Sequence, residues 1–417
     1  MATSSPSPIR HLELDALRGF AVMGILAMNI VTFGLPEMAY ISPAVHGGSD
    51  PADMTAWLAA FVLADGKMRG LFSLLFGASM MLVIARAEDN GADPACVHYS
   101  RMGWLAVFGL AHFYFIWWGD ILFLYAAAGS IAFLFREKEP RNLVILALLI
   151  CIAYFLFMAA GFGSIYMLEA AARAPGASEQ AIREFQIVME SFGADPDSTA
   201  SEIALYQGSW AGIVADKFRN ELFTPLLVLI NNIGETLALI LIGMALCKNG
   251  FLLGAAKTAS YRHWAAWGIG IGGAFYLAIG LYLIASGFDL LDALNAAVAW
   301  TIPGRLLMTI GYAAALVLLI RSFSASPLIL RVAAAGRAAF TNYLGTSIVM
   351  TAIFYGYGLG LFGKVGRWEL YLFVIGGCLA MLAWSKPWLD RYRYGPLEWL
   401  WRSLARRQWQ PMRLRPS

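Results

Sequence analysis

The chain has 417 residues, of which 59% are hydrophobic and only 14% are charged, and its mean hydropathy is +0.64. A soluble globular chain is much more polar, so this composition excludes that class and predicts an integral membrane protein. The formal net charge of +3 is too small to indicate a nucleic-acid-binding protein. Long apolar runs recur without an alternating strand pattern, so we expect an all-α, polytopic helical bundle.

Ten membrane segments are predicted from these apolar runs. In chain order they cover residues 17–36, 69–86, 101–118, 120–135, 142–165, 223–247, 264–286, 304–321, 338–361 and 368–385. The third and fourth are short and share the turn at Trp118-Gly119-Asp120, which favours a tight hairpin or a partly re-entrant pair. The predicted organisation is therefore N-terminal membrane helices (1–165), an outer segment (166–222), a C-terminal membrane domain (223–400) and a basic tail (401–417).

Charge indicates the orientation. Lysine and arginine concentrate in the connections on the side of the N-terminus, whereas the opposite connections carry acids such as Asp50 and Asp195. The positive-inside rule then places both termini in the cytoplasm. The outer segment repeats apolar side chains at helical spacing over 182–192 and 210–222, which predicts amphipathic helices on the outer face of the bundle. The tail mixes tryptophan with arginine, and both an inner-leaflet anchor and a solvated basic end stay open.

Ionisable and amide side chains nevertheless occur inside or at the ends of the apolar segments. A charge in hydrocarbon costs a few kcal/mol, so such groups normally face a bundle interior or a wet cavity. In the outer half they are Asn29, Asp65, Lys67, Arg69, His112, Asp120, Glu235 and Arg305. At the inner end they are Asp15, Arg18, Arg337, Asn342 and Tyr343. We therefore expect a polar cavity that opens outward and a second polar cluster at the inner end.

His112 and Asp120 lie in the stretch GLAHFYFIWWGD. His112 could be a core histidine bonded to a backbone carbonyl, and Asp120 could simply cap the helix that follows it. The two residues are eight positions apart, which is ~12 Å along a continuous helix and too far for a hydrogen bond. A break at Gly119 that folds Asp120 back would bring them together. With that break, we expect both to line one cavity wall, His112 deeper and Asp120 at its outer rim.

The other polar side chains also have structural interpretations. Lys67 and Arg69 could reach outward to lipid headgroups, and Asp15 and Arg18, three apart on a helix, could form only an ion pair. Glu235 is harder to explain in this way, because a carboxylate nearly a turn into an apolar helix needs a partner.

The sequence gives little indication of a metal site. No HxxxH, HExxH or paired-cysteine spacing occurs, so we expect no metal. The four scattered cysteines are predicted to pack as small apolar residues. His46 lies in an outer loop and is either exposed or part of a lid; exposure is favoured because Gly47 and Gly48 follow it.

Six blocks follow one another along nearly the whole chain: LDALRGFAVMGILAMNI, LFSLLFGAS, GLAHFYFIWWGDILFLYA, GETLALILIGMAL, GRAAFTNYLGTSI and GPLEWLWR. In this order they resemble the bacterial YeiB family, whose C-terminal half is a domain of unknown function. The LDxxRG start is also similar to the transmembrane acyltransferase superfamily, which includes the lysosomal heparan glucosaminide acetyltransferase. The resemblance implies a bacterial inner-membrane protein that passes an acyl group from cytoplasmic acyl-CoA to an acceptor outside.

By this resemblance Asp15, Arg18 and Asn29 take the positions of the superfamily motif. The catalytic histidine of the superfamily lies in the outer loop after the first helix or at the end of that helix, where this chain has Asn29. His46 is further along than that spacing suggests. The histidine that fits a YeiB-family motif is His112, in GxxHxxxxWxGD. Whether His112 or His46 is the base stays open at this point.

The leading hypothesis is a membrane acyltransferase, because acyl transfer needs only a base, a positioned donor and charge stabilisation. His112 would be the base, oriented by Asp120, with Asn29 hydrogen-bonded to the thioester carbonyl. Coenzyme A phosphates would bind Arg18, Arg337 and Asn342. The outer residues expected to hold an acceptor or a developing oxyanion are Asp65, Lys67, Arg69, Glu235 and Arg305.

Two other classes compete with this hypothesis. A transporter or flippase would use the same cavity, with Glu235 and His112 as proton-relay groups, although the two halves of the chain share no repeated motif. A non-catalytic assembly or sensor protein would leave the polar residues as structural pairs. Expected partners are membrane lipid and an acceptor that is a small molecule, a glycan or a lipid; a homodimer is left open, and no nucleic acid is expected.

Overall fold

The computed structural model describes residues 12–48 and 50–414, and these residues form helices joined by turns and loops, with no strand among them. The first half contains α1 (Leu12–Gly34), α2 (Glu37–Ile41), α3 (Pro51–Leu63), α4 (Lys67–Asp89), α5 (Pro94–Phe115), α6 (Leu122–Ala132), the 3-10 turn η1 (Phe133–Phe135), α7 (Pro140–Ala172), α8 (Glu179–Ser191), α9 (Pro196–Tyr206) and α10 (Trp210–Asn220). The second half contains α11 (Thr224–Lys248), α12 (Thr258–Ala285), α13 (Leu290–Asn295), the π-helical turn η2 (Ala296–Trp300), α14 (Ile302–Ser322), α15 (Pro327–Arg337), α16 (Ala339–Phe354), α17 (Arg367–Leu389) and α18 (Pro396–Ala405).

The all-α membrane architecture agrees with the sequence. Each of the ten predicted segments coincides with a helix, namely α1, α4, α5, α6, α7, α11, α12, α14, α16 and α17. Within the described part of the chain, seven helical stretches are long and apolar enough to cross a membrane: α1, the run of α3 and α4, α7, α11, α12, α14 and α17. Two of the remaining helices, α6 and α16, are shorter than the ~20 residues that span a bilayer.

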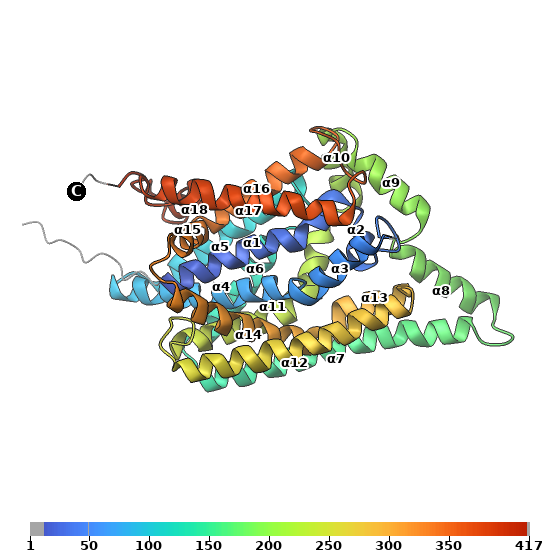
Figure 1. Ribbon diagram of the computed structural model, residues 1–417, viewed down its shortest axis with the longest axis horizontal. Coiled ribbons are helices and arrows are strands. Elements are labelled where there is room, and N and C mark those ends of the chain that lie inside the picture. The colour runs from blue at the N-terminus through green and yellow to red at the C-terminus, as the bar shows by residue number, and fades with distance from the viewer. Residues whose placement is uncertain (1–11, 49, 415–417) are drawn as a thin grey trace, which may run out of the picture.

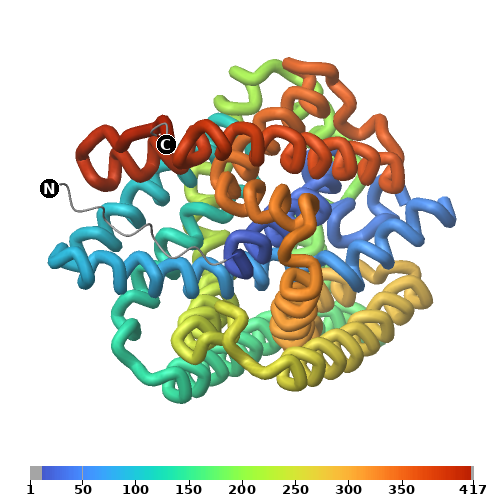
Figure 2. Tube along the Cα trace, turned by 60° about the vertical axis from the view of Figure 1, so that its left-hand side comes forward, coloured from blue at the N-terminus to red at the C-terminus, as the bar shows by residue number. Residues whose placement is uncertain are grey.

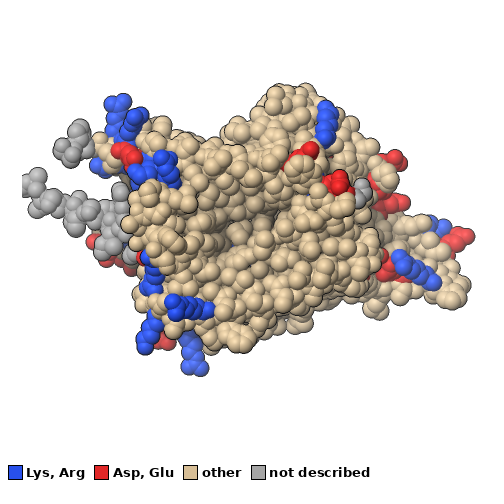
Figure 3. Space-filling model, viewed as in Figure 1, with Lys and Arg blue, Asp and Glu red and all other residues tan. Residues whose placement is uncertain are grey.

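The helices run roughly along one axis (Figure 1). The term "terminal end" denotes the end of the bundle where α1 begins and where α18 is found. The term "loop end" denotes the opposite end, which contains α8, α9 and α10. Viewed with the terminal end turned forward, α1 and α4 pass through the middle, α17 covers one flank, and α7 and α12 cover the other (Figure 2). Most lysine and arginine on the visible face gather at the terminal end, and most acidic residues at the loop end, with an uncharged belt between them (Figure 3).

Close packing of α4 and α11 depends on glycine. A Cβ atom on Gly77 would overlap the backbone of Ile240, and one on Gly243 would overlap the backbone of Leu74. The two helix backbones can therefore touch only because these positions carry no side chain. This contact holds the two helices side by side, roughly one to two turns from the point where Arg69 on α4 meets Glu235 on α11.

The predicted outer segment is helical, as its apolar spacing indicated. The helix α8 has no fully buried residue and contacts α7, whereas α9 and α10 bury Tyr206 and Ile213. Lys217 on α10 is 2% exposed, and its Nζ donates a hydrogen bond to the carbonyl of Phe113 at 2.8 Å. Burial lowers the pKa of Lys217 to about 8, because desolvation disfavours the charged amine.

The tail helix α18 is part of the bundle at the terminal end. The Glu398 carboxylate accepts hydrogen bonds from the backbone N–H groups of Phe340 and Thr341 at 2.7 and 3.1 Å, and so caps α16. On the other side of α18, the indole N–H of Trp401 donates to the carbonyl of Arg101 at 3.0 Å. The tail is therefore packed against α5 and α16, an arrangement that neither sequence interpretation had described.

Candidate functional site

A cavity of about 650 Å³ opens among α1, α4, α5, α16 and α18 near the terminal end. Six arginines line its wall, and this cavity is therefore called the arginine cavity. They are Arg18, Arg86, Arg101, Arg337, Arg393 and Arg402. Arg18 donates to Asp15 at 3.2 Å and to the Ser79 hydroxyl at 2.9 Å, which fixes its guanidinium against α4. Four of the five residues of the predicted inner cluster line this cavity, namely Asp15, Arg18, Arg337 and Tyr343, together with four arginines that the sequence had not indicated.

The arginine cavity is polar near the terminal end and apolar further in. Its wall on α4 runs from Arg86 through Ser79 to Phe72. These fourteen positions correspond to about 21 Å of helix at ~1.5 Å per residue. The inner part is lined by Phe72, Tyr125 and Tyr343. The cavity can therefore hold a long ligand with anionic groups at one end and an apolar arm at the other.

His112 and Asp120 are in direct contact. The His112 Nδ1 lies 2.9 Å from the Asp120 Oδ1, and His112 is 1% exposed. The approach occurs because α5 ends at Phe115, and Trp117 N–H then donates to the His112 carbonyl to form a turn. Asp120 also accepts from Phe123 N–H at 2.9 Å, so it caps α6 as well as binding the histidine. The two interpretations of Asp120 are therefore both realised.

The second ring nitrogen of His112 forms no hydrogen bond with the residues described. His112 Nε2 is buried and has no hydrogen-bond partner among the residues described. Tyr343, which lines the arginine cavity, packs with its ring centroid 5.3 Å from that of His112. Neither His112 nor Asp120 is among the residues that line the arginine cavity. In place of the cavity wall expected from sequence, the pair lies one side chain behind it.

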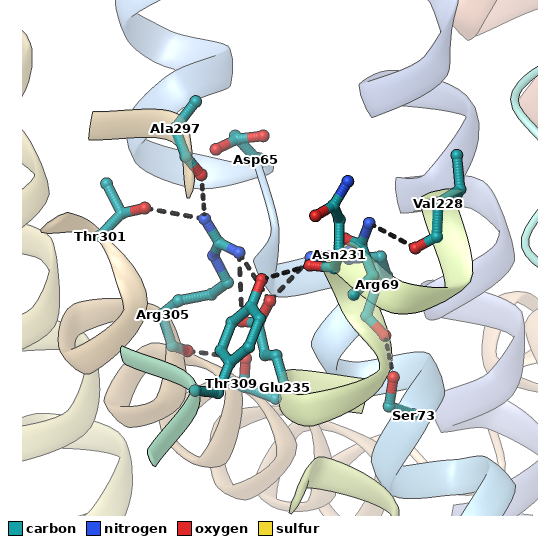
Figure 4. A network of polar contacts seen from close by, with 12 residues as sticks. Asp65, Arg69, Ser73, Val228, Asn231, Glu235, Ala297, Thr301, Arg305 and Thr309 are labelled. Carbon is teal, nitrogen blue, oxygen red and sulfur yellow. Dashed lines mark hydrogen bonds and ion pairs between the residues drawn. The ribbon is translucent and has the colours of Figure 1, made fainter. Parts of the chain in front are cut away.

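A second polar group lies between α4, α11 and α14, where Glu235 is flanked by two arginines (Figure 4). The Glu235 carboxylate accepts from Arg305 Nη1 at 3.1 and 2.8 Å and from Arg69 Nη2 at 2.8 Å. Arg305 also donates to the Thr301 hydroxyl and to the carbonyl of Ala297, each at 2.7 Å. Glu235, which needs a partner in an apolar helix, therefore has two, Arg305 and Arg69.

Lys67 and Asp65 lie beside this network. Lys67 is completely buried, donates to the carbonyl of Phe61 at 2.5 Å, and places its ammonium 3.0 Å from the ring centroid of Tyr276. It therefore does not reach outward to headgroups. Asp65 accepts a hydrogen bond from the Tyr40 hydroxyl and lines a small separate cavity near the loop end. Polar side chains of the loop-end half mostly pair with one another or with backbone carbonyls, so the wide cavity expected there is not needed to hide them.

Comparison with known proteins identifies the family. A domain described as "Protein of unknown function (DUF418)" matches residues 246–408. The uncharacterized protein YxaH of Bacillus subtilis is 32% identical over 412 residues, covering 96% of this chain and 95% of that protein. The uncharacterized protein YeiB of Escherichia coli is 32% identical over 411 residues, covering 95% of this chain and 97% of that protein. The chain belongs to the YeiB family. No solved structure matches it.

Other predicted site residues of this YeiB-family protein lie elsewhere. The amide of Asn342 donates to the carbonyl of Ala335 at 3.0 Å and accepts from the Trp384 indole at 2.9 Å, so it joins α15, α16 and α17. Asn342 is not among the residues that line the arginine cavity, so the structure does not support a role in phosphate binding. Asn29 is half-buried and also lies outside both cavity linings. The His46 ring is half-buried and contacts the carbonyl of Gly363 at 3.2 Å, which ties this loop to the loop that precedes α17.

Sequence reasoning missed four arginines of the cavity, Arg86, Arg101, Arg393 and Arg402. The signal that could have found them was the number of arginines at helix ends on one side of the membrane, which had served only to assign orientation. The described residues contain no group of three or more metal-ligating side chains.

Proposed function

We propose that this YeiB-family protein is a bacterial inner-membrane acyltransferase with about ten membrane-spanning helices. It would move an acyl group from cytoplasmic acyl-CoA to an acceptor on the periplasmic side. The observation that carries the proposal is the arginine cavity, with the buried His112–Asp120 pair directly behind its inner wall. Both chain termini are taken to lie in the cytoplasm, because arginine and lysine gather at the terminal end.

The arginine cavity suits an acyl-CoA donor in three respects. Guanidinium groups form paired hydrogen bonds with phosphate, and coenzyme A carries three phosphates. The apolar inner part suits the pantetheine arm and an acyl group. A volume of about 650 Å³ also lies within the range of roughly 300–1,000 Å³ found for ligand sites.

His112 is suited to act as the base. Its Nδ1–H donates to Asp120, which fixes the tautomer and leaves the Nε2 lone pair free to accept a proton. The acceptor hydroxyl or amine would give its proton to Nε2 and attack the thioester carbonyl. The resulting tetrahedral intermediate would expel coenzyme A as a thiolate, which takes that proton back from the imidazolium. A rotation of Tyr343, which lies against the His112 ring, would connect the base with the cavity.

The outer cations contribute less directly in this scheme. Arg305 is 4% exposed and its hydrogen-bonding groups are engaged by Glu235, Tyr276, Thr301 and Ala297. The Arg69 side chain is 20% exposed, so it is the network cation better placed to meet an acceptor or a developing oxyanion. Nothing in the contacts of Asn29 supports its assignment to the thioester carbonyl.

A transporter or flippase is the second candidate, and the Arg69–Glu235–Arg305 network favours it. Buried ionisable groups at this depth are characteristic of ion or proton pathways. The arginine cavity would then hold an anionic substrate, and this network would change protonation or pairing during transport.

The experiment that tests the first candidate measures acetyl-CoA binding by calorimetry on purified protein in nanodiscs. We expect binding in the wild type, and Arg18→Ala should weaken it roughly 10- to 100-fold, since a charge-assisted hydrogen bond is lost. Arg331→Ala is the matched control, because Arg331 is exposed on the neighbouring α15 and does not line the cavity. Absence of binding at every acyl length tested would remove the acyltransferase proposal and favour the transporter.

A further inference from the structure

A second, smaller cavity of about 30 Å³ lies near the loop end, and we call it the outer cavity. Its walls come from α1, α2, α3, α12, α13, η2 and α17. Since a cavity of roughly 10–15 Å³ holds one water molecule, this one has room for about two water-sized groups. It is therefore too small for a whole ligand, but large enough for one polar edge of a ligand.

Two hydrogen-bonding groups of the outer cavity are unused. Arg367, the first residue of α17, is 1% exposed; its Nη2 donates to the carbonyl of Ala39, but its Nε–H has no partner among the described residues. One turn later, the Tyr371 hydroxyl is buried and also lacks a partner in the described part of the chain. Both residues line the cavity. Leaving two such groups unpaired costs free energy, so a bound group that pairs with them is the direct physical explanation.

The charge of the cavity indicates what kind of ligand it takes. Its lining contains one cation, Arg367, and one anion, Asp65, whose carboxylate already accepts from Tyr40. A cavity this small would place an anionic ligand directly against the Asp65 carboxylate, whose like charge repels it. A hydroxyl group both donates and accepts, and so it can pair with the Arg367 Nε–H, with the Tyr371 hydroxyl and with Asp65.

The remaining wall is apolar and aromatic. Trp57 and Phe61 stack with ring centroids 5.0 Å apart and both line the cavity together with Ile41. A mostly apolar wall with a few convergent polar groups is the usual composition of a small-molecule site. Such a wall suits the C–H groups that flank the hydroxyl-bearing edge of a sugar or polyol.

We propose that the outer cavity binds the hydroxyl-bearing edge of a neutral sugar or polyol. The Arg367 Nε–H donates to one hydroxyl oxygen, and Tyr371 and Asp65 engage the same or the neighbouring hydroxyl. A sugar site at the loop end goes beyond acyl transfer, since it would exist whether or not the arginine cavity binds acyl-CoA.

The test is saturation-transfer NMR on the full chain in nanodiscs, with methyl α-D-glucopyranoside as the hydroxyl probe and acetate as the anionic probe. We expect saturation transfer to the glucoside and none specific to acetate. Tyr371→Phe, which removes only the hydroxyl, should weaken glucoside binding about fivefold, as expected for loss of one hydrogen bond to a neutral ligand. Arg367→Lys, which keeps the charge but removes the Nε–H, should do the same or more.

Two further variants keep the result interpretable. Ala60→Leu fills the cavity without touching a polar group and should abolish glucoside binding, because Ala60 lines the wall. Tyr357→Phe is the matched control; Tyr357 is 40% exposed and does not line the cavity, so binding should be unchanged. Equal glucoside signals in all variants, or acetate bound in place of glucoside, would overturn the proposal. Absence of saturation transfer to both probes with the wild type, as expected if the cavity holds only water, would also overturn the proposal.

Discussion

Replacing Glu235 by glutamine should strongly destabilise the protein. The carboxylate accepts three hydrogen bonds, two from Arg305 and one from Arg69, in a region where Glu235 and Arg305 are each 4% exposed. Glutamine keeps the shape of the side chain but leaves two arginines without a counter-charge. Breaking a buried ion pair by neutralising one partner costs about 3–5 kcal/mol, and more than one cation is affected here. We therefore expect a loss of about 3 kcal/mol or more.

Denaturant-induced unfolding of purified Glu235→Gln in nanodiscs measures this loss. The matched control is Asp390→Asn, because Asp390 forms an exposed pair with Lys386 at 2.8 Å across one helical turn. An exposed pair of this kind contributes only about 0.3–0.5 kcal/mol. The double variant Glu235→Gln with Arg69→Gln should recover part of the loss, since it removes one uncompensated cation. If Glu235→Gln is no less stable than Asp390→Asn, the network does not stabilise the bundle and the reasoning fails.

Three further predictions concern pH, packing and orientation. Unfolding raises the pKa of Lys217 from about 8 to 10.5, so between these pH values only the unfolded chain carries the proton on this amine. The free energy of unfolding should therefore rise on the order of 3 kcal/mol from pH 8 to pH 10.5. Unfolding curves recorded across this pH range should show the rise in the wild type and not in Lys217→Met. Gly243→Val should separate α4 from α11 and lower the midpoint of thermal unfolding. Gly161→Val should change that midpoint little, because a Cβ at Gly161 meets nothing within 4 Å. Equal midpoints for the two variants would contradict the packing account. A membrane-impermeant maleimide added to spheroplasts should label Ala200→Cys on the exposed side of α9 but not the native, exposed Cys96 at the terminal end. The reverse labelling pattern would show that the proposed orientation in the membrane is inverted.

The fold was largely predictable because hydrophobic length marks a membrane helix directly. The ten apolar segments all became helices, and the amphipathic spacing of the outer segment correctly indicated α8 and α10. Packing was not predictable in the same way. The buried faces of α4 and α11 meet at Gly77 and Gly243, and no local pattern says which glycines of two distant helices will touch.

The candidate site shows the same division between local and long-range information. Depth in an apolar helix was enough to predict that Glu235 needs a partner, but Arg305 and Arg69 lie 70 and 166 positions away, so the pairing needed the structure. The approach of His112 to Asp120 was anticipated as a break at Gly119; the helix in fact ends earlier, at Phe115.

Residues with an ordinary local role were the hardest to recognise. Arg86, Arg101 and Arg402 looked like boundary residues that fix orientation, and only the packing of α18 against α5 brings them to one cavity. Arg367 and Tyr371 carry no motif at all, and their unpaired groups become apparent only when the neighbouring side chains are in place.

The measurement that tests the central claim most directly is transfer of radiolabelled acetyl groups from acetyl-CoA to a membrane extract by proteoliposomes of wild type and His112→Gln. Acetyl-CoA binding and unfolding are measured on the same preparations. The account predicts that His112→Gln binds the donor and stays folded, yet transfers about 100-fold less or worse, as loss of a general base would give. Unchanged transfer by His112→Gln, or a variant that loses folding and transfer together, would contradict a catalytic role for this histidine.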